Sequence, residues 1–311
     1  MSAYTGRNVK SRLIRATGSD YVFHLINYVV LTLFLCIIIY PLYWVLLASI
    51  SDPNMINRGE IVLVPKGFFN DGYKALLEYP AIWRSYINTI YYTVLGMVFN
   101  VTVTILAGYG LSRPNMPFRK IIMRLLIFTM FFSGGLIPMY MLVRNLKLLD
   151  TVWALILPST LSIYNITVSR AFFQGSIPDG IVEAAQIDGC SNLGTFFRIV
   201  LPVSPAIISV MCLFHVVFRW NEYFSAMLYF SSSDKYPLQL IMREILISAR
   251  AMANQIGAGA TTDPRGLQEM QRQAQLIRYS SIIISTVPML VLYPFLQKYF
   301  VKGIMVGSLK G

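Results

Sequence analysis

Charged residues are scarce in this sequence. Only 13% of its 311 residues are Asp, Glu, Lys or Arg, whereas 56% are hydrophobic and the mean hydropathy is +0.59. Soluble domains carry about 25% charged residues and about 45–50% apolar residues. The shortage of charge argues against a soluble globular protein. The high hydrophobicity excludes a disordered chain, which cannot bury enough apolar surface to fold.

Groups that bind metals or carry catalysis are also few. The three cysteines, Cys36, Cys190 and Cys212, are too scattered for a disulfide framework, and the two histidines, His24 and His215, lack ligand spacing. The sequence contains no G-x-x-x-x-G-K-[S/T] loop that would cradle phosphate, and no paired catalytic carboxylates or Ser-His-Asp set. We therefore predict no enzyme activity, no metal site and no cofactor in this chain.

Long intervals without charge show the architecture. Six intervals of 31, 28, 19, 19, 20 and 19 residues contain no Asp, Glu, Lys or Arg, and they are rich in Leu, Ile, Val, Met and aromatic residues. A helix needs about 20 mostly apolar residues to cross a bilayer. The sequence therefore predicts an all-α polytopic membrane protein with six transmembrane helices, near residues 22–50, 85–111, 121–143, 152–173, 206–230 and 277–298.

The basic residues flank these spans, which gives a topology. The net charge is +12, but the cations do not form one surface, so a nucleic-acid partner is rejected. With the N-terminus inside, inner segments hold 13 Lys and Arg against 12 outside, and the inner ones crowd the span ends. We expect both termini in the cytoplasm. The expected domains are a tail at 1–20, a membrane domain at 21–298 with an inner loop at 174–205 and an outer loop at 231–276, and a tail at 299–311.

The inner loop 174–205 has the signals of two short helices. Pro178 suits a first helical position, and Asp179 favours the positive N-terminal end of the helix. Gly189 fits the left-handed residue that follows a helix end, and Ser191 is a typical cap for the next helix. The small side chains of Ala184 and Ala185 allow another surface to approach. The loop is either an ordinary connection or a docking element.

A specific pattern favours docking. The loop fits E-A-A-x-x-D-G followed by F-x-x-I-x-L-P and resembles the EAA loop of permease subunits of binding-protein-dependent ABC importers. The matching residues are Glu183, Ala184, Ala185, Asp188, Gly189, Phe196 or Phe197, Ile199, Leu201 and Pro202. The stretch Trp220–Phe224 and the glycine-rich tail 301–311 are similar to maltose-transporter-type permeases. Residues 132–151 resemble the branch named for lipoprotein and complex-polysaccharide uptake.

The resemblance implies a type I importer fold and a set of partners. These are a second permease subunit, two ABC ATPases that bind ATP and Mg, an extracytoplasmic solute-binding protein, membrane lipid and an oligosaccharide. The implied location is the bacterial cytoplasmic membrane. It also implies that Glu183 meets a basic residue of the ATPase, and that Gly307, Ser308 and Lys310 in the tail contact the ATPases. A frayed, solvated tail is the alternative.

The path of the substrate is less well marked. Arg219 and Glu222 interrupt the fifth span, and they are neighbours on one helix face. They either pair with each other, face the partner permease or line the path. The candidate path residues are Arg219, Trp220, Asn221, Glu222 and Tyr223.

Four further features concern local structure. Prolines at positions 41, 138, 158 and 288 predict kinks, and Gly134-Gly135 predicts close helix packing. In the outer loop, the apolar spacing of 238–252 predicts an amphipathic helix, and 257–266 predicts a flexible turn.

The sequence leaves other functions open. A permease for another solute, for example of the glycerol-phosphate type, would share most of these features. A stand-alone facilitator would leave the EAA pattern without a purpose. A membrane-embedded enzyme would need polar catalytic groups in the spans, where only Arg219, Glu222 and His215 are available.

Overall fold

The computed structural model describes residues 18–257, 272 and 274–294. These residues form helices, and among them the only extended pairing is an isolated bridge between Ser51 and Phe68. The predicted all-α fold is therefore confirmed. The chain divides after Phe68 into two units, which are described separately.

The first unit consists of one long helix and a compact loop. Helix α1 spans Gly18–Ser49 and is followed by the short helix α2, Pro53–Asn57. The Asp52 side chain caps α2 by accepting a hydrogen bond from the Asn54 backbone N–H at 2.9 Å. The loop then returns toward α1, because the Asp52 N–H donates to the Lys66 carbonyl at 3.1 Å.

The second unit is built around α4, Pro80–Ser112, which packs against α8, Ile163–Ser176, and α11, Pro205–Asn221. The other helices of this unit are α3 (Asp71–Leu77), α5 (Arg119–Phe131), α6 (Leu136–Asn145), α7 (Val152–Ile156), η1 (Leu157–Ser159), α9 (Asp179–Ile187), α10 (Asn192–Thr195), η2 (Phe196–Val200), α12 (Phe224–Tyr229), η3 (Ser233–Lys235), α13 (Leu238–Gly257) and a last helix, Ala274–Pro294.

Two glycines let the neighbouring helices approach α4. A Cβ atom at Gly108 would lie 2.5 Å from the Ser169 Cβ on α8, and one at Gly96 would lie 2.9 Å from the His215 Nε2 on α11. Small residues at such crossings are typical of membrane helix packing. At Gly134-Gly135, where close packing is predicted, the described residues show no approach by another helix: a Cβ at Gly134 would lie 3.8 Å from the Pro138 Cβ, and one at Gly135 would meet nothing within 4 Å.

Three helices are long and apolar enough to cross a membrane unbroken: Ser19–Ser49, Pro80–Ser112 and Ala274–Pro294. Three further pairs of helices meet the same test only together, because each pair is sharply bent. The described residues therefore hold three spans, or up to six if each bent pair is one span, which fits a six-span fold.

The prediction of a continuous third helix over 121–143 was wrong. Helices α5 and α6 meet at an angle of 114°, and the break at Phe132–Gly135 contains Gly135 with a φ of +86°. This backbone conformation suits glycine because it has no Cβ atom.

The fourth and fifth predicted helices, 152–173 and 206–230, are also broken. In the fourth, η1 holds Pro158, and η1 and α8 are separated by a bend of 54°. In the fifth, α11 ends at Asn221, and the chain restarts as α12 at Phe224. The Glu222 backbone is extended, and its carboxylate accepts a hydrogen bond from the Ser225 N–H at 2.7 Å, so this residue ends one helix and starts the next.

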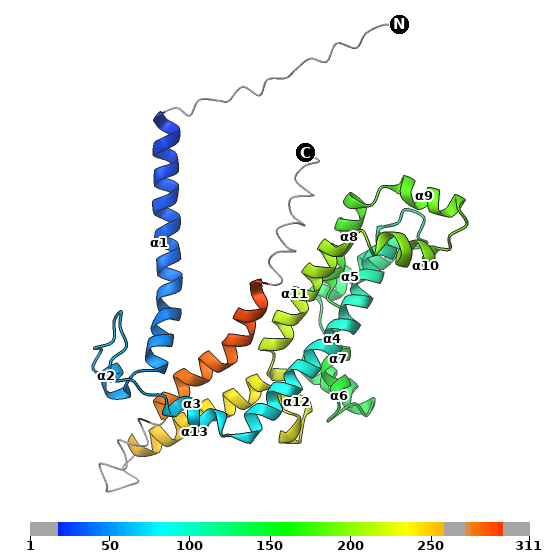
Figure 1. The fold of residues 1–311 in the computed structure, drawn as a ribbon. Coiled ribbons are helices and arrows are strands. Elements are labelled where there is room, and N and C mark those ends of the chain that lie inside the picture. The colour runs from blue at the N-terminus through cyan, green and yellow to red at the C-terminus, as the bar shows by residue number, and fades with distance from the viewer. Residues whose placement is uncertain (1–17, 258–271, 273, 295–311) are drawn as a thin grey trace. The chain divides into compact units, whose positions relative to one another are not determined.

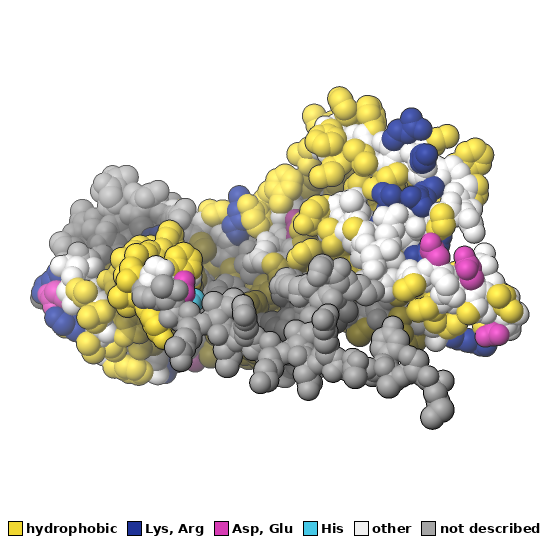
Figure 2. Space-filling view, turned by 90° about the horizontal axis from the view of Figure 1, so that it is seen from above, with side chains coloured by type: hydrophobic (Ala, Val, Ile, Leu, Met, Phe, Trp, Pro, Cys, Tyr) yellow, Lys and Arg dark blue, Asp and Glu magenta, His cyan; other side chains and the backbone are white. Residues whose placement is uncertain are grey.

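The predicted inner and outer segments of the second unit lie at opposite ends of it. Helices α9 and α10 lie at one end, and α6, α12 and α13 lie at the other (Figure 1). Figure 2 looks onto the α9 end and shows, on its right, several Lys and Arg side chains with Asp and Glu side chains beside them.

Helix α13 confirms the predicted helix over 238–252 and continues to Gly257. Its side chains Leu238, Leu240, Ile241 and Met242 are buried, whereas Glu244 is exposed. Most of the predicted turn at 257–266 and the tails 1–17 and 295–311 lie outside the described residues.

Candidate functional site

Helix α9 begins one residue later than the sequence suggests. Pro178 is its N-cap, with an extended ψ of 140°, and Asp179 is the first helical residue. Asp179 therefore lies at the positive end of the helix dipole, where a carboxylate is stabilising.

The end of α9 matches the glycine prediction. Gly189 has a φ of +79° and donates its N–H to the Gln186 carbonyl at 3.0 Å, and the Cys190 N–H donates to the Ala185 carbonyl at 2.9 Å. These two bonds make a Schellman motif, which ends the helix sharply and satisfies its last carbonyls. The chain then turns into α10, whose Ser191 cap accepts from the Gly194 N–H at 3.1 Å.

The turn after α9 is anchored in the core of the second unit. Phe196 is 3% exposed and clusters with Ile105 of α4, Phe173 of α8 and Met211 of α11. Burial of a phenylalanine side chain contributes about 1.5–3 kcal/mol. The loop is therefore packed against α4, α8 and α11. Pro202, which ends this segment, is exposed.

One face of α9 has no cover within the described residues. Ala185 is buried against the unit, but Glu183, Ala184 and Asp188 are exposed, and Ile187 is 86% exposed. An isoleucine so exposed beside the small side chain of Ala184 and the Glu183 carboxylate makes a surface that a partner can contact closely. The predicted coupling residues Glu183, Ala184, Asp188 and Gly189 all lie on this uncovered side or at its end.

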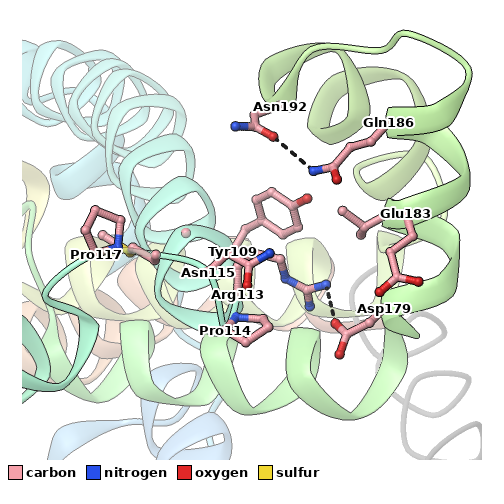
Figure 3. A pocket seen from close by; sticks show the side chains of 12 residues that line it. Tyr109, Arg113, Pro114, Asn115, Pro117, Asp179, Glu183, Gln186 and Asn192 are labelled. Atoms are coloured by element: carbon pink, nitrogen blue, oxygen red, sulfur yellow. Dashed lines mark hydrogen bonds and ion pairs between the residues drawn. The ribbon is translucent and has the colours of Figure 1, made fainter.

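Arg113 joins α9 to two of the central helices. It follows α4, and its side chain is 14% exposed. Its guanidinium donates to the Phe173 carbonyl on α8 at 3.0 Å and lies 3.2 Å from the Asp179 carboxylate of α9 (Figure 3). It also donates to the Ser112 hydroxyl at 2.9 Å and lies over the Tyr109 ring, with Cζ 5.2 Å from the centroid. One side chain thus contacts α4, α8 and α9.

Two other arginines cap the same end of α4. Arg170 of α8 donates to the Leu111 carbonyl at 3.2 Å, and Arg119 of α5 donates to the Ser112 carbonyl at 3.4 Å. The last carbonyls of a helix carry partial negative charge and lack partners within the helix. The guanidinium groups satisfy them and tie α5 and α8 to the end of α4.

A cavity of about 480 Å³ lies between the turn 113–117 and α9. Figure 3 shows Arg113, Asp179, Glu183 and Gln186 around it, with the Gln186 amide facing Asn192 at 3.5 Å. No group of three or more His, Cys, Asp or Glu that suits a metal occurs in the described part of the chain.

The five candidate path residues do not form one site. Arg219 is buried and donates to the Leu155 carbonyl at 2.9 Å and to the Ser159 hydroxyl, and it lies 3.6 Å from the Glu222 carboxylate. The pairing alternative for Arg219 and Glu222 is therefore the one that the structure shows. These contacts join α11 to α7 and η1.

The neighbours of this ion pair separate into buried and exposed groups. Trp220 is buried and donates its indole N–H to the Ser285 carbonyl at 3.0 Å, so it holds the last helix. Asn221 donates to the Val217 carbonyl of its own helix. Tyr223 is 37% exposed and has the Arg243 guanidinium of α13 over its ring at 4.9 Å. Among the five candidate residues, Asn221 and Tyr223 are exposed, whereas Trp220 lines an apolar cavity of about 620 Å³ between α4, α11 and the last helix.

The opposite end of the unit has its own ion pair, between Lys235 and Asp150 at 2.5 Å. Asp150 also accepts from the Ser231 and Ser232 N–H groups at 3.2 and 3.4 Å. The hydrogen bond from Lys235 lowers the pKa of Asp150 below its ordinary value, and the two backbone bonds add to this effect. This pair ties the turn before α7 to η3.

Sequence reasoning missed Arg113 as a site residue. Only its position four residues after Tyr109, on the same helix side, hints at its contact with the Tyr109 ring. The tail residues Gly307, Ser308 and Lys310 lie outside the described residues.

Comparisons with known proteins agree on one group. Residues 100–306 match the family described as binding-protein-dependent transport system inner membrane component. The polygalacturonan/rhamnogalacturonan transport system permease protein YtcP of Bacillus subtilis is 37% identical over 290 residues, which cover 93% of this chain and 99% of that protein. Protein LplC of the same species is 37% identical over 295 residues, covering 95% and 97%.

A solved structure matches over a similar length. It is the crystal structure of a bacterial ABC transporter involved in the import of the acidic polysaccharide alginate. The match has a TM-score of 0.78 and 28% identity, and it covers 91% of this chain and 98% of the other.

Proposed function

The chain belongs to the family of binding-protein-dependent transport system inner membrane components, and we propose that it is the permease subunit of an ATP-driven importer that moves an oligosaccharide delivered by a solute-binding protein. Membership confirms the predicted resemblance to permease subunits of binding-protein-dependent importers. It also makes the chain an inner-membrane transport component rather than an enzyme.

The observation that carries the proposal is the uncovered face of α9. A short helix stopped by a Schellman motif presents Glu183, Ala184 and Ile187 outward, while Ala185 and Phe196 hold it on the unit. Covering the Ile187 side chain alone is worth about 1.5–3 kcal/mol. We propose that an ABC ATPase binds this face and that Glu183 contacts one of its basic residues.

Arg113 supplies the link from this face to the spans. A displacement of α9 pulls on Asp179, and Arg113 passes the force to the ends of α4 and α8. Because α4 packs against both α8 and α11, the force reaches the centre of the unit. The proposed mechanism is alternating access, in which closure of two ATPases moves α9 and opens the spans to the binding protein.

The substrate proposal rests on the relatives. Two of them, at 37 and 28% identity, are named for polysaccharide transport. Exposed Asn221 and Tyr223 offer an amide and an aromatic ring, groups that suit sugar hydroxyls and sugar ring faces. The proposed partners are a second permease subunit, two ATPases and the binding protein. Both termini are proposed to lie in the cytoplasm, where the tail residues Gly307, Ser308 and Lys310 would reach the ATPases.

The test is a charge reversal on the uncovered face. The chain is expressed with its partner permease, ATPases and binding protein, and the complex is reconstituted in liposomes. Glu183→Lys is expected to abolish oligosaccharide uptake, through loss of the ATPase from the complex or through ATP hydrolysis without transport. Normal uptake by this variant would contradict the proposed docking of the ATPase on α9.

The control is Gln174→Lys, which introduces the same lysine side chain at an exposed position on α8 near the same end and changes the charge by one unit instead of two. It is expected to transport normally. Transport by the chain alone without ATP would instead identify a facilitator. Uptake of glycerol phosphate but of no oligosaccharide would keep the importer and change its substrate.

A further inference from the structure

We propose that the loop segment Ile61–Val64 of the first unit is a membrane anchor that lies in the lipid interface at the C-terminal end of α1. The inference concerns a surface that takes lipid, and it does not depend on the proposed transport function.

The segment exposes consecutive apolar side chains. Val62 is 54% exposed, Leu63 63% and Val64 66%. Apolar surface costs about 25 cal/mol per Å² when it stays in water, so an ordered loop that presents three such residues in a row is suited to an apolar medium.

Aromatic side chains of α1 satisfy the backbone of this segment. The Trp44 indole donates to the Ile61 carbonyl at 3.1 Å, the Tyr40 hydroxyl to the Val62 carbonyl at 3.4 Å, and the Tyr43 hydroxyl to the Leu63 carbonyl at 2.7 Å. Three successive carbonyls thus have donors from the protein. Water would serve these groups in a solvated loop, whereas a carbonyl in lipid without a donor costs several kcal/mol.

The depth of these donors in the bilayer follows from the length of α1. Its apolar run begins after Asp20, and about 20 residues of helix, or about 30 Å, cover the hydrocarbon thickness. That distance ends near Tyr40. Tyr40, Tyr43 and Trp44 therefore lie where tyrosine and tryptophan are enriched in membrane proteins, at the boundary between hydrocarbon and water.

The loop comes back to this level from farther out. Helix α1 continues to Ser49, about 13 Å beyond Tyr40, before the chain turns through α2. The return to Tyr40 and Tyr43 brings Val62 and Leu63 to the boundary rather than away from it.

Charged residues flank the segment on both sides. Glu60 lies 4.0 Å from Arg58 and 3.5 Å from Lys66 in two ion pairs. These pairs are exposed and belong in water. The apolar segment between Glu60 and Lys66 is therefore a short dip that enters the interface and leaves it again.

Collision accessibility of a nitroxide tests the depth of the loop. The full transporter, with Cys36, Cys190 and Cys212 changed to serine, carries one new cysteine at Leu63 and is reconstituted in liposomes. Labels at Arg58, which is exposed beside Glu60, and at Ile37, on the exposed face of α1, give the water and lipid references. We expect the ratio of oxygen to nickel-chelate collisions at Leu63 to fall between those references.

Two results would overturn the proposal. A ratio equal to that at Arg58 would place the loop in water. Suppression of both kinds of collision would show that a protein surface, from this chain or a partner, covers it.

A second measurement tests the aromatic donors. Tyr43→Phe removes the hydroxyl that donates to Leu63 and keeps the ring. Loss of one net hydrogen bond of about 1 kcal/mol shifts the equilibrium between docked and undocked loop about fivefold, so the Leu63 label should move toward the water reference. Tyr28→Phe, on an exposed part of α1 away from the loop, is the control and should change nothing. No response to Tyr43→Phe would contradict the role of the donors.

Discussion

Arg219 and Arg113 perform the same task in two different surroundings. Each joins helices by donating to a backbone carbonyl and a hydroxyl and by pairing with a carboxylate. The Arg219 side chain is 3% exposed among the spans, whereas that of Arg113 is 14% exposed at the end of the unit, and its partner Asp179 is 66% exposed. The first is a buried tie between helices of the spans, and we propose that the second is a joint that is loaded when α9 moves.

The largest effect is expected from breaking the buried tie. Arg219→Leu leaves Glu222 without its cation and removes the bonds to Leu155 and Ser159, and removal of one partner of a buried pair costs about 3–5 kcal/mol. We expect little assembled complex and a much lower Tm, measured by fluorescence-detected gel filtration after heating. A variant with normal yield and Tm would show that Arg219 is not needed for folding and would remove the contrast with Arg113.

Breaking the joint is expected to affect transport more than folding. Arg113→Ala removes bonds to charged groups worth about 1.5–3 kcal/mol in partly exposed surroundings, so the complex should still assemble. Oligosaccharide uptake per ATP hydrolysed should fall, because α9 then moves without α4. Arg113→Lys keeps the charge but not the planar fork that reaches three partners, and it should rescue only in part. Equal loss of uptake and of assembled complex would make Arg113 structural, as Arg219 is.

A smaller effect is expected from the stop of α9 itself. Gly189→Ala meets nothing within 4 Å but places an alanine at a φ of +79°, which costs about 1–2 kcal/mol. Gly180→Ala is the matched control, because that glycine is helical and equally open, and it should be neutral or slightly stabilising. ATPase binding to detergent-purified permease measures both. If both variants bound the ATPase with equal affinity, the turn at Gly189 would not matter for docking.

The smallest effect is expected at the half-buried ion pair of Lys235 and Asp150 at the opposite end. Lys235 lowers the pKa of Asp150, so this pair stabilises the fold above the ordinary carboxyl pKa and is lost as the pH falls through the lowered value. Asp150→Asn should lower Tm slightly at pH 7 and make no difference once the native carboxyl is protonated. A Tm difference that grows toward acid pH would have the wrong sign and would contradict this assignment.

The spans and the helix ends could be predicted from the sequence, because segments that lie in a membrane contain almost no charged residues. Absence of charge located the spans, and the local rules for helix ends placed Gly189 after the end of α9 and Ser191 at the N-cap of α10. Those features depend on a few neighbouring residues and on the surrounding solvent.

The missed features depend on contacts between distant segments. The residues next to Arg113 do not predict that its side chain reaches Phe173 and Asp179, which lie 60 and 66 positions away in the sequence. Likewise, the breaks at Gly135 and Glu222 occur inside apolar runs, where hydrophobicity alone predicts an unbroken helix. The contact of Trp220 was missed for a similar reason, since its acceptor Ser285 belongs to the last helix.

The two glycines of α4 have a consequence for how the membrane part moves. Because Gly96 and Gly108 lie against His215 and Ser169 with no room for a Cβ, we expect α4 to resist turning about its own axis or sliding along α8 and α11. We therefore expect these three helices to move together in the proposed transport cycle. The bends at residues 201–204 and 222–223 are then the places where we expect the chain to flex.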